Sequence, residues 1–170
     1  MANTYTAIAT VTVGSGGAAN IEFTSIPQTY TDLLVKASVR DARTGDIFSN
    51  LLIRFNGSSS NLSARRLFGN GTSAASSAPS SSIVTVLNGP LSTSNTFSSG
   101  EFYIPNYTSA NNKSVSTDIV TENNATESYQ ELNAGLWSDS SAITSITLLS
   151  NYSVNLVQYS TATLYGIKNS

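Results

Sequence analysis

Residues Ser141 to Ile167 read SAITSITLLSNYSVNLVQYSTATLYGI and contain two runs of strong strand formers. The first run covers Ala142 to Leu149 and the second covers Leu156 to Ile167. Both are rich in Ile, Leu, Val, Thr and Tyr, which suit a half-buried pleated surface. The polar residues at 150–153 favour a turn through hydrogen bonds to the backbone. The stretch therefore predicts two consecutive strands joined by this turn. The second strand has apolar groups on both faces, which is typical of a strand in the middle of a sheet or at a subunit contact.

The same period-two alternation recurs along the rest of the chain, with turn residues between most of the runs. We expect further strands at Tyr5 to Val13, Asn20 to Thr24, Asp32 to Arg40, Leu51 to Phe55, Ile83 to Leu87, Thr96 to Ile104, Ser114 to Glu122 and Ser128 to Trp137. The run from Asn61 to Phe68 is compatible with a single helical turn. With so many short strands and no long helix, the sequence predicts an all-β, antiparallel two-sheet sandwich of the jelly-roll type.

Turn chemistry and length indicate the organisation of the chain. The glycines at 14–17 supply the positive φ angles of a tight reversal, so the first two strands are expected to form a hairpin. Gly69 to Ser82 is almost free of large apolar residues, and we expect a long, exposed and flexible loop there. A chain of 170 residues suits one domain, spanning residues 1–170.

The alternation also predicts which side chains face the interior. Nine apolar residues at inward positions are expected to be mostly buried: Leu33, Val35, Val39, Ile53, Phe55, Ile104, Ile146, Leu148 and Leu164. Arg40 is expected on a solvated strand face. In the strand at 128–137, we expect Leu132 and Ala134 to be buried and Glu131 to be exposed.

Composition excludes several classes of function. Ser and Thr account for 50 residues and Asn for 17, whereas only 11% of residues are charged, a balance unlike that of disordered chains. The net charge of −2 gives no attraction to phosphate backbones or anionic membranes, so we expect neither nucleic acid nor membrane as a partner. Cysteine and histidine are both absent, which removes Ser-His-Asp and Cys-His catalysis and most zinc, copper and iron ligation. We also expect no signal peptide and no spanning segment.

Four carboxylates, Glu122, Glu127, Glu131 and Asp139, fall within 18 residues. Two carboxylates at a suitable separation can act as acid and base on a sugar, and several oxygen ligands can hold calcium. Solvated carboxylates on a strand face explain the spacing better, because no EF-hand pattern is present. The sequence therefore predicts no catalytic residue, no cofactor and no metal.

Arginine and aromatic side chains near loops and strand ends give candidate interface residues, since both types are enriched at protein contacts. Arg65 and Arg66 precede an apolar pair and fit either an interface or an ion pair beside the core. Trp137 fits a core or interface position better than sugar stacking. The candidate set is Arg65, Arg66, Phe68, Tyr103, Tyr107 and Trp137.

Several stretches resemble small structural proteins of tailed phages, particularly marine ones. They are Ile21 to Pro27, Tyr30 to Leu33, Arg54 to Gly57, Ser63 to Gly71, Tyr103 to Tyr107 and, most distinctively, Gln158 to Ile167. The resemblance covers most of the chain and includes no catalytic signature.

This resemblance implies a non-enzymatic β-sandwich component of the virion, made in the host bacterial cytoplasm and commonly a homotrimer. One position is on the capsid, as a decoration (cement) protein that binds the major capsid protein or other virion proteins and reinforces the shell. The alternative is a tail-fibre or receptor-binding module that recognises a host glycan.

Overall fold

The computed structural model describes residues 4–124 and 127–168, and these residues form strands and loops without any helix. No helix long and apolar enough to cross a membrane is therefore found in the described ranges. The strands are β1 (Thr4–Thr12), β2 (Asn20–Phe23), β3 (Asp32–Val39), β4 (Phe48–Phe55), β5 (Leu62–Gly69), β6 (Ala74–Ser77), β7 (Ile83–Asn88), β8 (Ser98–Ile104), β9 (Lys113–Val120), β10 (Gln130–Trp137), β11 (Ile146–Ser150) and β12 (Thr161–Lys168). All paired strands are antiparallel, so the all-β sandwich prediction is confirmed.

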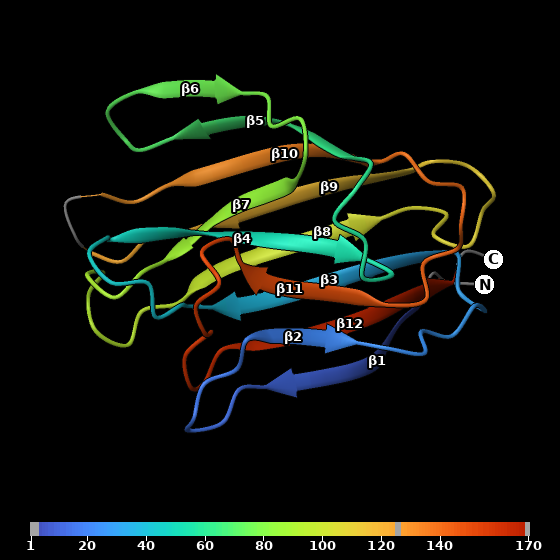
Figure 1. Cartoon of the computed structure of the whole chain (residues 1–170), viewed down its shortest axis with the longest axis horizontal. Helices are drawn as coiled ribbons and strands as arrows, with labels where there is room; N and C mark the ends of the chain where they lie inside the picture. The colour runs from blue at the N-terminus through green and yellow to red at the C-terminus, as the bar shows by residue number, and fades with distance from the viewer. Residues whose placement is uncertain (1–3, 125–126, 169–170) are drawn as a thin grey trace.

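The strands form two facing sheets (Figure 1). The larger sheet has the order β1-β12-β3-β8-β9-β10-β5-β6, and the smaller has the order β2-β11-β4-β7. If the two hairpins β5-β6 and β9-β10 are set aside, the remaining eight strands have the alternating order of a jelly roll. The two hairpins are insertions that lengthen the larger sheet on one side. As a result β5 and β6 lie beyond β7, at the top of the view in Figure 1.

The predicted N-terminal hairpin is wrong, and the two C-terminal strands joined by the turn at 150–153 are not paired with each other. β11 lies in the smaller sheet between β2 and β4, whereas β12 lies in the larger sheet between β1 and β3. β1 and β2 are separated in the same way. The connection before β12 is long enough to cross the end of the sandwich, and it is held there because Leu156 is buried and exchanges backbone hydrogen bonds of 2.7 and 3.0 Å with Ala18.

The segment at 61–82 also differs from its prediction. The expected helical turn is strand β5, which pairs with β10 along its whole length from Leu62 to Gly69. The expected irregular loop at 69–82 contains β6, which pairs with β5. All four residues of β6 are exposed, as expected, but a regular strand stands where the sequence predicted none. Small polar residues gave no alternating pattern from which this hairpin could be recognised.

The interior confirms the predicted core and corrects one strand residue. All nine apolar residues predicted to be buried are buried. Arg40, expected on a solvated face, is buried instead, because its guanidinium donates hydrogen bonds to the backbone carbonyls of Pro90, Ser92, Thr93 and Thr96. The side chain thus ties β3 to the loop between β7 and β8. Burial lowers the pKa of Arg40 from its usual value.

Candidate functional site

The face of the larger sheet that points away from the smaller sheet, here called the outer face, carries side chains in regular cross-strand rows. The strand register aligns Lys36, Glu101, Asp118, Leu132 and Leu67 in one row across β3, β8, β9, β10 and β5. The adjacent row contains Leu34, Tyr103, Ser116, Ala134 and Arg65 on the same strands. Polar groups dominate the β3 side of these rows, and apolar groups gather toward β10 and β5.

Five large apolar or aromatic side chains of the outer face are between 36% and 57% exposed, and we call them the outer-face patch. They are Leu67, Tyr103, Val120, Leu132 and Leu136. Each belongs to β5, β8, β9 or β10, so well-paired strands hold the patch. A group of exposed apolar side chains on a rigid surface is typical of a contact with another molecule.

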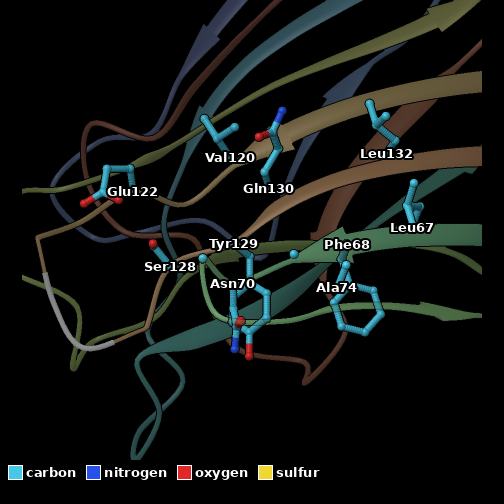
Figure 2. Close-up of a pocket in the computed structure, with 12 residues that line it drawn as sticks. Leu67, Phe68, Asn70, Ala74, Val120, Glu122, Ser128, Tyr129, Gln130 and Leu132 are labelled. Atoms are coloured by element: carbon cyan, nitrogen blue, oxygen red, sulfur yellow. The ribbon is translucent and has the colours of Figure 1, made fainter.

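A hollow of about 510 Å³ lies at one end of the patch, where β9, β10 and the β5–β6 turn meet. Figure 2 shows Leu67, Val120, Gln130 and Leu132 projecting on one side of the ribbons. The rings of Phe68 and Tyr129 project on the opposite side. The open face of the hollow is therefore aliphatic rather than aromatic.

The polar end of the hollow carries Glu122, Ser128 and Gln130. The backbone N–H of Asn124 donates a hydrogen bond of 2.8 Å to the Glu122 carboxylate. That bond, with a second from the Ser128 side chain, lowers the pKa of Glu122. The hollow can accommodate an apolar group whose polar or cationic end faces an ionised carboxylate.

Two charged residues of the outer face have no ion-pair partner in the described part of the chain. Arg65 donates a hydrogen bond only to the carbonyl of the preceding Ala64, at 2.9 Å. Asp118 stands directly opposite Glu101 on the neighbouring strand, and like charges in that position repel. Lys36 contacts Glu101 at 2.7 Å and so neutralises one of the two carboxylates.

The predicted faces of β10 are reversed in the structure. Glu131 and Asn133 point inward, whereas Leu132 and Ala134 are exposed. The reversal is possible because the Arg66 guanidinium binds the Glu131 carboxylate through two nitrogens and Asn133 donates to Glu131 at 2.6 Å. A buried carboxylate is tolerated where it is paired and hydrogen-bonded in this way.

The six candidate interface residues are not brought together. Arg65 and Tyr103 lie on the outer face. The Tyr103 hydroxyl donates a hydrogen bond of 2.9 Å to Asp32. Burial, together with the hydrogen bond to Asp32 and its negative charge, raises the pKa of Tyr103. Arg66 and Phe68 point to the inner side of β5, with the guanidinium 5.5 Å from the ring centroid.

Tyr107 and Trp137 are corrections, because both side chains are fully buried and present nothing to a partner. The Tyr107 hydroxyl donates to the carbonyl of Pro27, and the Trp137 ring packs 5.6 Å from that of Phe55. Each ring is large enough to fill the space between the sheets, which explains the burial.

The sequence reasoning missed Leu67, Val120, Leu132 and Leu136. For the two leucines of β10, Leu132 and Leu136, the sequence did contain one indication of the outward orientation. Trp137 shares a strand face with Glu131, Asn133 and Gly135, so placing the largest side chain in the core turns Leu132 and Leu136 outward.

The four clustered carboxylates are dispersed as well. Glu131 is inside the sandwich, and Asp139 accepts a hydrogen bond of 2.7 Å from the backbone N–H of Ser141 in a loop. Among residues 4–124 and 127–168, no group of three or more acidic side chains is placed to hold a metal ion. The arrangement of these residues offers neither a paired acid and base nor a cation site.

Comparisons with known proteins found no match among family models, curated proteins or solved structures.

Proposed function

We propose that this chain is a non-enzymatic assembly subunit, and specifically a capsid decoration protein that binds the coat subunits of a tailed phage. The outer-face patch is the observation that carries the proposal. It places aliphatic and aromatic groups at the solvent boundary of a rigid eight-stranded sheet, where a second protein can cover them. Isolated exposed leucines are ordinary, but a group spread over four adjacent strands is not.

The side-chain chemistry supports a binding role over a catalytic one. Histidine and cysteine are absent from the sequence, and the buried carboxylate of Glu131 is neutralised by Arg66. The exposed carboxylates Glu101 and Glu122 are engaged with Lys36 and with the backbone of Asn124. Asp118 stands opposite Glu101, but both carboxylates are exposed, so this close pair lacks the contrasting environments that acid and base catalysis usually requires.

The placement on a virion rests on the sequence resemblance, and so does the expectation of three copies. The stretches that carry the resemblance contribute to the fold. Asn56 accepts hydrogen bonds from the backbone N–H groups of Thr144 and Ser145, at 2.8 and 3.1 Å, and Gly166 leaves room for the ring of Tyr30.

A tail-fibre or receptor-binding module that recognises a host glycan is the second candidate. The hollow beside Gln130 and Glu122 favours it, since amide and carboxylate groups there can hydrogen-bond sugar hydroxyls. The exposed side chains of the outer-face patch weaken it, because four of the five are aliphatic and suit a protein contact better than a sugar. The capsid role is therefore the better-supported proposal.

The test is to add the purified, fluorescently labelled chain to phage particles that lack it. Saturable binding of hundreds of copies, with capsids that resist heating better, is the expected result. Binding of only a few copies at the tail, together with retention of a sugar on a glycan array, would transfer the proposal to the receptor-binding role. Absence of particle binding with turnover of an oligosaccharide would refute both.

A further inference from the structure

We propose that the outer-face patch is a two-fold contact through which two copies of this chain associate face to face. The proposed capsid role uses the same patch, so the inference concerns the free chain, and a copy that binds the coat through this face would have to leave the pair. It rests on the positions of six outer-face residues that the strand register fixes: Arg65, Leu67, Tyr103, Asp118, Leu132 and Leu136.

The positions follow from sheet geometry. Neighbouring strands lie about 4.8 Å apart, and successive residues on one face of a strand lie about 6.8 Å apart. Arg65 is two strands and one row from Asp118, with β10 between them, so their Cα atoms are about 12 Å apart across the face. Among the described residues the two side chains form no ion pair with each other.

Let the outer faces of two copies meet, related by a two-fold axis that lies in the plane between them and crosses β10 obliquely. This axis places Arg65 of each copy over the position of Asp118 in the other copy. The same axis places Leu67 of one copy almost over Leu132 of the other. Measured in the plane of the sheet, the two positions are about 3 Å apart. It also places Leu136 of one copy over the position of Tyr103 in the other. A single rotation thus matches one charged pair and two apolar pairs, and each contact occurs twice, as an isologous interface requires.

Charge gives a second reason for this partner. Asp118 is left opposite Glu101 with only Lys36 to offset the two carboxylates, and Arg65 has no carboxylate of its own. In the proposed pair the Arg65 guanidinium of each copy meets the Asp118 carboxylate of the other. This removes the repulsion on β8 and β9, and it sets the orientation of the two faces.

The size of the face indicates a reversible contact. Four strands and four rows cover about 20 by 25 Å, roughly 500 Å², which is less than the roughly 800 Å² per partner of standard stable interfaces. We therefore expect a dimer that dissociates on dilution, with a dissociation constant on the order of micromolar. The proposed contact is two-fold, so it would give pairs of the isolated chain and not the three copies that the sequence resemblance implies.

Sedimentation equilibrium between micromolar and millimolar concentration tests the proposal. The average mass is expected to rise from the 17.8 kDa of one chain toward twice that value. Leu132→Glu is expected to keep the protein monomeric throughout. Leu91→Glu is the matched control, because Leu91 is similarly exposed but lies in the loop between β7 and β8. Circular dichroism and thermal melting establish that each variant is folded.

Exchanging the charges of Arg65 and Asp118 distinguishes this specific contact from non-specific hydrophobic association. Arg65→Asp and Asp118→Arg are each expected to weaken association at least tenfold, because each single variant sets like charges against one another. The double variant is expected to recover most of the wild-type affinity, since the pair is re-formed with the charges exchanged. Glu22→Arg, on the exposed surface of the smaller sheet, controls for a change in net charge.

Three outcomes would overturn the proposal: a monomer of wild-type protein at millimolar concentration, a trimer, or a double variant no better than either single variant. An equal effect of Leu91→Glu and Leu132→Glu would also overturn it, because association would then not depend on this face. Binding to capsids can succeed or fail whatever the mass of the isolated chain, so this test is separate from that of the proposed function.

Discussion

Replacing Glu131 with alanine is expected to lower the free energy of unfolding by about 3–5 kcal/mol, because the change leaves a guanidinium without its carboxylate. Glu131 is only 1% exposed and accepts hydrogen bonds from Nε of Arg66 at 3.0 Å and from Asn133 at 2.6 Å. The Arg66 side chain retains 17% exposure, so water solvates part of the orphaned charge and the lower end of the range is expected.

Urea denaturation followed by the fluorescence of Trp137, which lies on the same strand, measures this loss. A chain of this size loses about 2–4 °C of melting temperature per kcal/mol, so a drop of roughly 6–20 °C should accompany the loss of about 3–5 kcal/mol. The double variant Arg66→Met with Glu131→Leu provides the comparison, because an apolar pair of similar volume usually restores stability. A loss below about 1 kcal/mol, or a double variant as unstable as Glu131→Ala, would show that pairing with Arg66 is not what makes the inward position of Glu131 stable.

Three further predictions concern the core and one buried amine. Leu164→Ala should cost about 2–5 kcal/mol in urea titration, because Leu164 is fully buried; a cost below about 1 kcal/mol would contradict its core position. Gly166→Val should destabilise the fold strongly, since a Cβ there would lie 2.4 Å from the Tyr30 ring. Adding Tyr30→Ala to the same chain should recover part of the lost melting temperature. Absence of any recovery would show that the clash with Tyr30 is not the cause. Burial lowers the pKa of Lys113 below its usual 10.5, so between the two values the unfolded state binds more protons and the free energy of unfolding should rise with pH. Lys113→Met should abolish that rise, and an unchanged slope would assign it to another group.

The sequence was sufficient for most of the strands, though not for β5 and β6, and for the nine predicted core residues, because burial and alternation are local properties. Leu33, Val35 and Val39 fall on one side of β3 by spacing alone, and the structure confirms them. Strand pairing is not a local property. Turn-forming residues such as Ser150 to Ser153 and the glycines at 14–17 have the same chemistry in a tight hairpin as in a connection between sheets. The predicted N-terminal hairpin therefore failed, and the residues at 150–153 did not indicate that the chain changes sheet.

The candidate site was predicted less well, since its orientation depends on partners distant in sequence. Glu131 enters the interior because Arg66, 65 residues earlier, supplies the opposite charge on the adjacent strand. Without that pairing, hydrophobicity favours the opposite face of β10, and Leu132 is expected inside. Of the six candidate interface residues only Arg65 and Tyr103 reached the outer face, because residue type alone cannot separate a buried aromatic anchor from an exposed one.

The position of β12 has a consequence for how the chain is made. The last described strand is an internal member of the larger sheet, hydrogen-bonded to β1 on one side and to β3 on the other, and Lys168 faces Thr4 across the pair. A ribosome delivers the N-terminal residues first, but β1 has no neighbour in its own sheet until the final strand emerges. β1 and the edge of β3 therefore stay unpaired until residues 161–168 have been made. Completion of the larger sheet is tied to the synthesis of β12, and a product that stops before residue 161 lacks the strand that joins β1 to β3.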